Sequence, residues 1–244
     1  MLRVIGHIES CYREKFGTPR QGALVPEAPA RLRVLPEFLP EYSLLGLEEF
    51  SHVWLLFRFH LNTNKTLCSK IHPPRLRGKT IGVFASRSPH RPSPIGLTLA
   101  RLQRIEGPTL HLEGVDLVNG TPVLDIKPYI PACDRPARPR TGWVERCRAP
   151  RLRVAFTRKA LADLEAVVPA AERARVKRLI ARSLANDPRN PRDKSQWRPE
   201  KEFAFFILHY DAHFRVQDGR ARVFRVDPAD EAARRRPPLA PGLL

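Results

Sequence analysis

The first half of the chain alternates short apolar runs with turn-forming residues. The runs have period-two or continuous apolar character, and Gly, Pro and Asn residues separate them. Such runs are typical of β-strands. They span residues 2–8, 49–59, 80–86, 97–105, 109–115 and 121–129. Five or six strands at this spacing favour a barrel or a closed sheet.

The second half combines strand and helix periodicity. A strand is predicted at 151–156, followed by helices at 158–168 and 170–184. The second helix carries an apolar face, because residues at helical spacing share one side. Its members are Val176, Leu179, Ile180 and Leu184.

The pattern after the helices predicts a β-hairpin. The apolar stretch 202–216 is expected to be one continuous strand that turns at Asp218-Gly219 and returns through 222–226. The sequence therefore predicts a mainly β N-terminal barrel with a small α+β C-terminal domain.

Proline and arginine mark the expected domain boundary. Prolines oppose helices and sheet ladders, so residues 135–150 are predicted to be a linker between a barrel domain at 1–134 and an α+β domain at 151–228. Residues 229–244 are expected to be a disordered tail.

The charge of the chain is strongly positive. Its 43 Lys and Arg residues against 25 Asp and Glu residues give a formal net charge of +18, of which +13 lies in residues 135–226. This excess favours a polyanionic partner, most often nucleic acid, docked by the second half. Solubility in an arginine-rich proteome is the alternative explanation.

Several classes of protein are disfavoured by what the sequence lacks. No GxGxxG follows a predicted strand, which argues against a Rossmann-type fold. No apolar run has the roughly 18 residues of a membrane span, and the first residues lack a signal-peptide pattern. The four cysteines form no CxxC, so a zinc ribbon or disulfide framework is not expected. We expect a cytoplasmic protein.

Three polar segments are too specific for simple turns. Residues 12–21 combine cations, aromatic rings, Gly and Pro, as in a fixed loop that holds an anion or stacks on a base. In residues 87–96, closely spaced prolines stiffen a loop that presents Arg87 and Arg91. Residues 116–129 form a turn followed by a strand.

Four motifs together resemble a known family. They read YREKFGTPRQ, LEEFSHVWLLFRFH, GVFASRSPHRPSPIG and DLVNGTPVLDIKPYIP, and they span most of residues 1–134. In order and spacing they are similar to the TrmO (TsaA-like) family of S-adenosylmethionine-dependent tRNA methyltransferases.

The resemblance implies a cofactor, a reaction and an assembly. Members bind S-adenosylmethionine on a β-barrel, form homodimers and methylate N6 of threonylcarbamoyl-modified adenosine 37, beside the anticodon of tRNA. The residues that match the family's cofactor contacts are Pro19, Arg20, Gln21, His60, Leu61, Arg87, Leu97, Asp116, Leu117, Val118 and Asn119.

The catalytic group is expected on the strand that follows residue 121. Asp125, Lys127 and Tyr129 share one face of that strand. By elimination, Asp125 is the candidate that accepts a hydrogen bond from N6, with Lys127 and Tyr129 fixing its orientation. The alternative is an ion pair between Asp125 and Lys127 that only stiffens the strand. Arg87 and Arg91 are candidates for holding a carboxylate of the cofactor or of the modified base.

Basic side chains are the candidates for gripping the anticodon arm of tRNA. Phosphate contacts of this kind make affinity depend steeply on salt. The candidates are Arg13, Lys15, Arg91, Arg175, Arg178, Arg182 and Arg189, with Trp197 as a stacking surface. The alternative for the helix arginines is a solvated face.

No metal site is predicted. His209 and His213 are four apart, but in an expected strand this spacing separates them by some 13 Å. Two alternatives to the tRNA methyltransferase stay open: a non-catalytic RNA-binding barrel, and a methyltransferase for another RNA or a small molecule.

Overall fold

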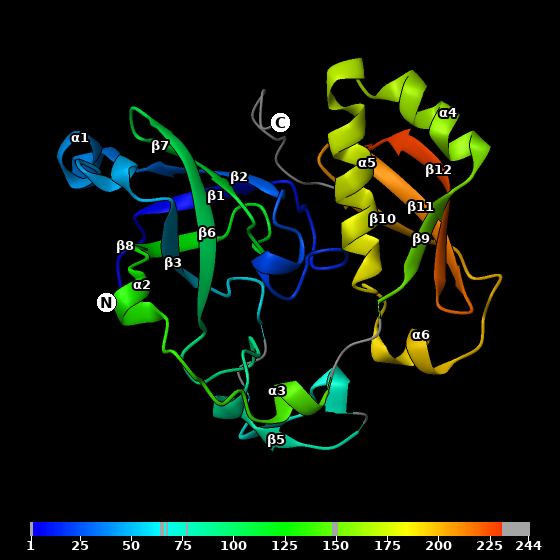
Figure 1. Cartoon of the computed structure of the whole chain (residues 1–244), viewed down its shortest axis with the longest axis horizontal. Helices are drawn as coiled ribbons and strands as arrows, with labels where there is room; N and C mark the ends of the chain where they lie inside the picture. Colours follow the sequence, from blue (N-terminus) through cyan, green and yellow to red (C-terminus); the bar gives the residue numbers. More distant parts are fainter. Residues whose placement is uncertain (1, 64–65, 67, 77, 148–150, 231–244) are drawn as a thin grey trace. The chain divides into compact units, whose positions relative to one another are not determined.

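A closed barrel of six strands is built from the first half of the chain (Figure 1). The computed structural model describes residues 2–63, 66, 68–76, 78–147 and 151–230. Around the barrel the strand order is β1-β2-β7-β6-β3-β8. The strands are β1 (Gly6–Ser10), β2 (Pro29–Val34), β3 (His52–Arg58), β6 (Ile95–Glu106), β7 (Thr109–Glu113) and β8 (Pro122–Pro128). The predicted barrel is therefore confirmed. Because the sheet is closed, it leaves no strand edge unpaired.

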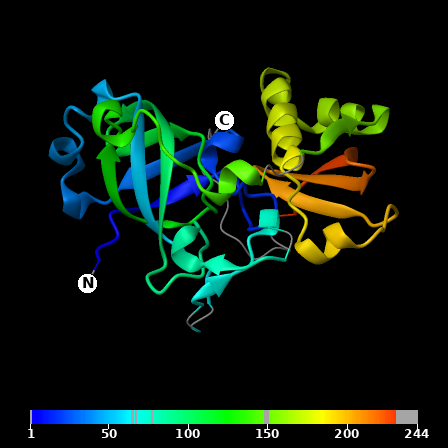
Figure 2. The ribbon, with the colours of Figure 1, turned by 60° about the horizontal axis from the view of Figure 1, so that its bottom comes forward.

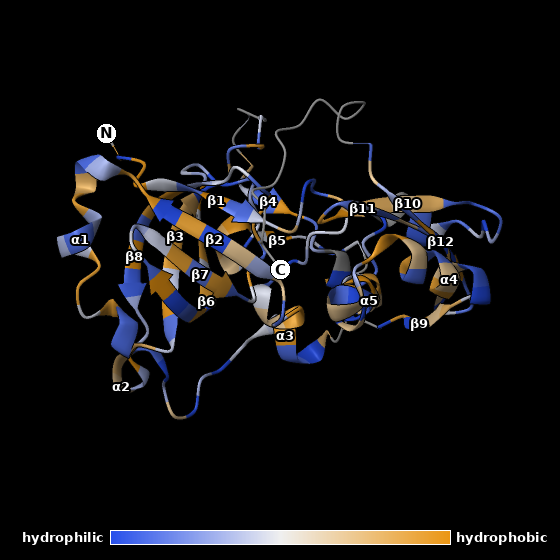
Figure 3. Cartoon of the chain, turned by 90° about the horizontal axis from the view of Figure 1, so that it is seen from above, coloured by the Kyte–Doolittle hydropathy of each residue, from blue (hydrophilic) through white to orange (hydrophobic). Residues whose placement is uncertain are grey.

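Period-two patterning fills the barrel interior. In β3, Val53, Leu55 and Phe57 are buried, whereas the residues between them are partly exposed. Figure 3 shows hydrophobic and hydrophilic positions on the same barrel strands. Because successive side chains of a strand point to opposite sides, the intervening residues lie on the outside of the barrel.

The strand predictions for the barrel hold for five of the six strands. The strand β2 was missed, because Arg31 and Arg33 interrupt its apolar residues on the outward side. The expected strand at 80–86 is wrong: only β5 (Ile81–Gly82) pairs there, with β4 (Lys70–Ile71), and the chain then turns into a 3-10 helix.

Short helices lie between the barrel strands and after the last of them, β8. They are α1 (Pro40–Ser43), α2 (Pro131–Asp134), α3 (Trp143–Arg146) and the 3-10 helices Gly22–Leu24, Pro36–Phe38, Leu47–Glu49, Pro74–Leu76 and Val83–Ala85. The helix α3 lies inside the expected linker 135–150, so part of that segment is ordered. The tail beyond residue 230 lies outside the described residues.

A second sheet follows, with strand order β10-β11-β12-β9. Its strands are β9 (Arg153–Phe156), β10 (Phe203–Ile207), β11 (Tyr210–Gln217) and β12 (Arg220–Pro228), and the helices are α4 (Arg158–Val167), α5 (Ala170–Ala185) and α6 (Pro191–Ser195). Both long helices were predicted, and Thr157 caps the first by accepting a hydrogen bond from the Ala160 amide. Figure 2 shows α4 and α5 beside the orange and red strands of this sheet.

The expected single strand at 202–216 is two strands. Leu208 has a φ of 55°, and the chain reverses at Leu208 and His209 between β10 and β11. The apolar character continues through this turn because Leu208 is itself buried, which hid the reversal in the sequence. His209 therefore lies in a turn, and the strand-based separation from His213 was wrong.

The chain forms two compact units that interleave along the sequence. The first contains the described residues of 1–8, 32–112 and 121–149, and the second those of 9–31, 113–120 and 150–244. The core of the second unit therefore joins Cys11, Tyr12 and Val25 to side chains of the C-terminal sheet and helices. The sequence-based boundaries stay a prediction. No helix of the described chain is long and apolar enough to cross a membrane.

Candidate active site

In the first unit, the loop 87–96 is held by its own backbone and side chains. The Ser88 amide donates to Oγ of Ser86 at 3.2 Å. The Arg91 guanidinium donates to the Ser86 carbonyl at 2.8 Å. It also lies 5.7 Å from the Phe84 ring centre. The loop is thus fixed as predicted, but Arg91 helps to hold it, whereas Arg87 is exposed.

The end of β3 is tied to this loop. The side-chain amide of Asn62 donates to the Pro89 carbonyl at 2.8 Å, and the Phe59 amide donates to the Pro94 carbonyl at 2.8 Å. His60 and Leu61 lie between these two attachments. The structure therefore brings three predicted cofactor positions, His60, Leu61 and Arg87, to one end of the β3–β6 pair.

A row of outward side chains joins a predicted cofactor residue to the predicted catalytic residue. Leu56 of β3 is paired with Leu97 of β6 on one side and with Asp125 of β8 on the other. Paired residues of neighbouring strands point to the same face. At the usual strand spacing, Leu97 and Asp125 stand about 10 Å apart. Leu97 is 46% exposed, so this row is accessible.

Asp125 forms the ion pair that the sequence left open. Its Oδ2 lies 3.0 Å from Nζ of Lys127, and its Oδ1 accepts a hydrogen bond from the Ile126 amide. The Tyr129 ring lies 6.0 Å from the ring of Trp54 and 6.3 Å from that of His52. The ion pair fixes the carboxylate and leaves it half-exposed, which is compatible with either role.

In the second unit, the start of the loop 12–21 contacts the predicted cofactor residues Val118 and Asn119. Tyr12 forms a parallel bridge with Val118, and the Asn119 amide donates to the Tyr12 carbonyl at 2.7 Å. Oδ1 of Asn119 accepts from the Ser10 amide at 3.0 Å. The structure therefore brings Tyr12, at the start of the loop 12–21, next to Val118 and Asn119.

The loop 12–21 presents its residues unequally. Lys15 and Arg20 are exposed, whereas Pro19 is buried and Gln21 donates to the Arg20 carbonyl at 2.6 Å. Arg13 is only 3% exposed, and its guanidinium lies 5.3 Å from the Phe206 ring centre. Burial of this kind assigns Arg13 to packing more than to solvent-facing phosphate contacts.

The C-terminal sheet holds that loop in place. The Leu208 amide donates to the Cys11 carbonyl at 2.8 Å, and the Phe206 amide donates to Oε1 of Glu14 at 3.3 Å. The Phe16 ring packs against the stacked rings of Phe203 and Phe214, at 6.5 and 6.4 Å between ring centres. Burial also raises the pKa of the Cys11 thiol far above its ordinary value.

These supporting residues were missed in the sequence. Phe203, Phe205 and Phe206 belong to the run FAFFI, which was interpreted only as part of a hairpin. Its unbroken apolar character was the available signal, because a strand that is apolar at successive positions is covered on both faces.

Three of the six predicted tRNA-binding arginines form ion pairs within the second unit. Arg175 lies 3.0 Å from Glu113, Arg182 lies 2.9 Å from Glu27, and Arg189 lies 2.9 Å from Asp187. Their charges are therefore partly compensated. Two further candidates, Arg178 and Trp197, are exposed.

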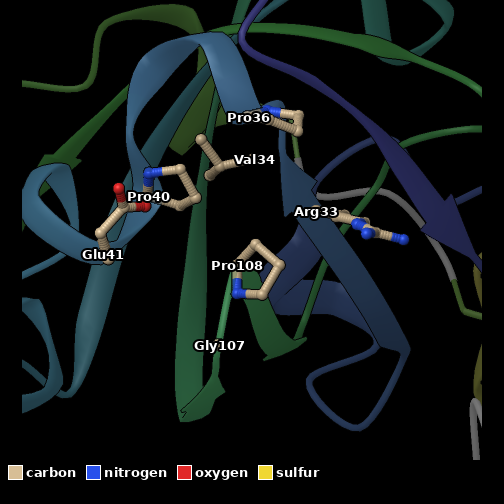
Figure 4. Close-up of a pocket in the computed structure, with 7 residues that line it drawn as sticks. All are labelled: Arg33, Val34, Pro36, Pro40, Glu41, Gly107 and Pro108. Atoms are coloured by element: carbon tan, nitrogen blue, oxygen red, sulfur yellow. The ribbon is translucent and has the colours of Figure 1, made fainter.

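A shallow hollow elsewhere on the first unit contains none of the predicted residues. Its volume is about 320 Å³, and Figure 4 shows its lining of Arg33, Val34, Pro36, Pro40, Glu41, Gly107 and Pro108. Within the described part of the chain, no group of three or more His, Cys, Asp or Glu side chains is placed to hold a metal ion.

Comparison with protein families gives two matches in sequence order. Residues 7–135 match the tRNA-methyltransferase O N-terminal domain, and residues 149–229 match the TrmO C-terminal domain. A crystal structure of TrmO from Pseudomonas aeruginosa is similar, with a TM-score of 0.76 and 36% sequence identity, covering 93% of this chain and 97% of that chain.

Individual relatives match over different lengths. The tRNA (adenine(37)-N6)-methyltransferase of Escherichia coli K12 is 36% identical over 232 residues, which cover 92% of this chain and 96% of the relative. The mouse protein of the same description is 54% identical over 134 residues, which cover 54% of this chain and only 31% of the relative. Because both family domains match and a bacterial relative aligns almost throughout, the chain belongs to the TrmO family.

Proposed function

We propose that the protein is an S-adenosylmethionine-dependent methyltransferase that modifies N6 of adenosine 37 in tRNA. The supporting observation is the outward row Leu97–Leu56–Asp125, which places a candidate cofactor contact and a candidate hydrogen-bond acceptor on one accessible strip of the barrel. The Escherichia coli relative, a tRNA (adenine(37)-N6)-methyltransferase, points to the same reaction.

The residues of the first unit fit the chemistry of S-adenosylmethionine. That cofactor has an adenine ring, a carboxylate and an activated methyl group on a sulfonium, and it supplies the methyl group when bound. Leu61 and Leu97 are 38% and 46% exposed, so they offer apolar surface to the adenine ring. The Arg87 guanidinium is suited to the carboxylate. Residues 19–21 and 116–119 are the candidates from the second unit.

The chain itself contributes position and hydrogen bonding. The exocyclic nitrogen of adenine is a weak nucleophile because its lone pair is delocalised into the ring. A carboxylate that accepts a hydrogen bond from the N6–H group raises the electron density on the nitrogen. Asp125 is the candidate for this role. Its ion pair with Lys127 fixes its orientation. Alignment of the reacting groups lowers such barriers by up to about 7–11 kcal/mol.

The proposal extends to the preferred substrate, the assembly and the location of the protein. The preferred substrate carries the threonylcarbamoyl group, whose carboxylate suits an exposed cation such as Lys15. The protein acts as a homodimer in the cytoplasm, on the anticodon arm of tRNA, and requires no metal ion.

Isothermal titration with S-adenosylmethionine tests the proposal first. The wild-type protein should bind saturably, and Arg87→Ala should weaken binding about 10- to 100-fold, because a hydrogen bond to a charged group is lost. Arg104→Ala is the matched control, since Arg104 is exposed on β6 and pairs with Glu106. A folded wild-type protein that binds no cofactor would favour the non-catalytic RNA-binding alternative.

Methyl transfer to tRNA is the second measurement. Tritiated methyl groups should appear in tRNA that carries the threonylcarbamoyl group, and more slowly in tRNA that lacks it. Transfer to neither would assign the enzyme to another RNA or a small molecule. Asp125→Asn separates the two roles of the carboxylate: a catalytic role predicts a lower kcat at unchanged thermal stability, and a structural role predicts the opposite.

A further inference from the structure

One face of the C-terminal sheet carries a set of arginines that the sequence did not single out. In the register of the sheet, Gln217 of β11 is paired with Arg220 of β12, which is paired with Arg153 of β9. In the next row, Arg215 of β11 is paired with Arg222 of β12. Residues in register share a face, and so do residues two apart in one strand. Arg153, Arg215, Arg220 and Arg222 therefore form one group, which we call the basic sheet face.

The opposite face of the same strands is buried. Phe214, Val216, Ala221 and Val223 alternate with the arginines and belong to the core that contains residues of α4 and α5. The four arginines are all exposed. The sheet thus has one apolar side under its helices and one accessible, strongly basic side.

The charges of the basic sheet face are poorly compensated. Of these four arginines, only Arg215 has a carboxylate partner among the described residues, Glu202. Arg153, Arg220 and Arg222 have no ion-pair partner in the part of the chain that the structure describes. Neighbouring strands stand about 4.8 Å apart, so these guanidinium groups repel one another, and a polyanion that binds them relieves this repulsion.

Two of the helix arginines differ in this respect. Arg175 and Arg182 of α5 are paired with Glu113 and Glu27. A phosphate that approached them would compete with a carboxylate already in place. Uncompensated exposed arginines are better suited to bind phosphate, because no existing ion pair has to be broken.

An aromatic ring lies beside the arginines. The Arg215 guanidinium is 5.0 Å from the ring centre of Phe224, which is partly exposed on β12. Arginine planes and aromatic rings on a sheet are surfaces on which unpaired bases stack. This combination suits RNA better than it suits a lipid surface.

We infer that the basic sheet face is the surface on which the phosphate backbone of tRNA docks. The inference rests on the proposed function, which supplies tRNA as the polyanion, and it moves the docking site from helix α5 to the outer side of β9, β11 and β12. Helix α5 keeps a structural role, in which Arg182 and Arg175 hold Glu27 and Glu113.

The test compares two triple variants of the full-length chain. Arg153→Gln, Arg220→Gln and Arg222→Gln together remove three charges from the basic sheet face. Arg175→Gln, Arg178→Gln and Arg182→Gln remove three charges from α5. For each protein, the Kd for unmodified tRNA transcript is measured from 50 to 300 mM salt, and circular dichroism and thermal melting check the fold.

The sheet variant should bind tRNA more weakly and with a smaller salt dependence. Loss of three phosphate contacts lowers the slope of log K against log[salt] by about 2–3. Its affinity for S-adenosylmethionine should stay within twofold of wild type. The α5 variant should keep a slope within about 1 of wild type, because its arginines make no phosphate contacts.

Three outcomes would overturn the inference. They are an unchanged slope in the folded sheet variant, an equal loss in both variants, and a loss of binding to phosphatidylserine vesicles with tRNA binding intact. Failure of the proposed function has a separate signature: the wild-type protein would then bind tRNA without transferring a methyl group to it, or would not bind tRNA at all.

Discussion

The indole nitrogen of Trp143 donates a hydrogen bond to the carbonyl oxygen of Ala85, at 2.9 Å. Trp143 begins the short helix α3, 58 residues after Ala85, and Ala85 lies two residues before Arg87. The segment predicted to be a linker rich in Pro and Arg therefore holds the chain just before the loop that carries a candidate cofactor contact.

We expect Trp143→Phe to weaken S-adenosylmethionine binding about two- to tenfold. The ring remains, but one hydrogen bond worth about 0.5–1.5 kcal/mol is lost, and the loop gains freedom. Titration calorimetry measures the Kd, and thermal melting controls for the fold. An unchanged Kd would show that the effect of this hydrogen bond does not reach Arg87.

Gly17→Ala should disturb the loop 12–21 more than a simple backbone effect allows. Gly17 has a φ of +89°, and an added Cβ would lie 2.6 Å from the ring of Phe205. The φ alone costs roughly 1–2 kcal/mol, and overpacking adds about 1–3 kcal/mol. In Gly17→Ala, both the free energy of unfolding and the affinity for S-adenosylmethionine should be lower than in the wild type.

Gly46→Ala is the matched control for Gly17→Ala. Gly46 has a φ of +82°, but a Cβ there meets no atom within 4 Å. Gly46→Ala should therefore lower the free energy of unfolding only by the cost of the positive φ. Its affinity for S-adenosylmethionine should equal that of the wild type. Equal effects of the two substitutions on cofactor binding would remove the loop 12–21 from the candidate site.

Gly96→Ala should destabilise the barrel. An added Cβ would lie 2.2 Å from the tip of the Phe57 ring, which is buried inside the barrel opposite Gly96. We expect a loss of about 1–3 kcal/mol in the free energy of unfolding, measured in urea. Gly82→Ala, where a Cβ meets nothing within 4 Å, should be close to neutral. Phe57→Leu should recover part of the loss in the double variant.

Acidification should weaken the fold through His213. Partial burial and the neighbouring Arg225 hold the pKa of His213 below its ordinary value of 6.5, against the opposing effect of Asp227 and other carboxylates. The unfolded chain therefore takes up this proton first, so stability falls as the pH drops from about 6.5 toward the lower pKa of the folded state.

Urea unfolding at several pH values measures this effect. Between pH 7 and pH 5.5, the free energy of unfolding should decrease more for the wild-type protein than for His213→Gln. His7→Gln, on the exposed side of β1, is the control and should follow the wild type. A His213→Gln profile parallel to that of the wild type would contradict the prediction.

The barrel was largely predictable because its signal is local. Val53, Leu55 and Phe57 repeat at period two, and this pattern depends only on neighbours in the strand. The strand β2 escaped because two arginines occupy its outward positions. Arginine is common on exposed faces, so an apolar scan does not find such a strand.

The candidate site was only half predictable. The motif residues His60, Leu61 and Arg87 come together through hydrogen bonds that no pattern announces, such as that from Asn62 to Pro89. The hydrogen bond from the Phe206 amide to the Glu14 carboxylate joins residues that are 192 positions apart in the sequence. Periodicity carries no information about contacts of this range, and the register that aligns the basic sheet face became visible only with the strands paired.

The interleaving of the two units also has a consequence for synthesis on the ribosome. The second unit takes Cys11, Tyr12 and Val25 from the start of the chain and Leu179, Ile180 and Phe205 from its last third. At typical elongation rates, about 10–40 s separate the emergence of the first group from that of the second. During this time the motif YREKFGTPRQ is exposed without its core, so the protein acquires that part of its candidate site only after translation is nearly complete.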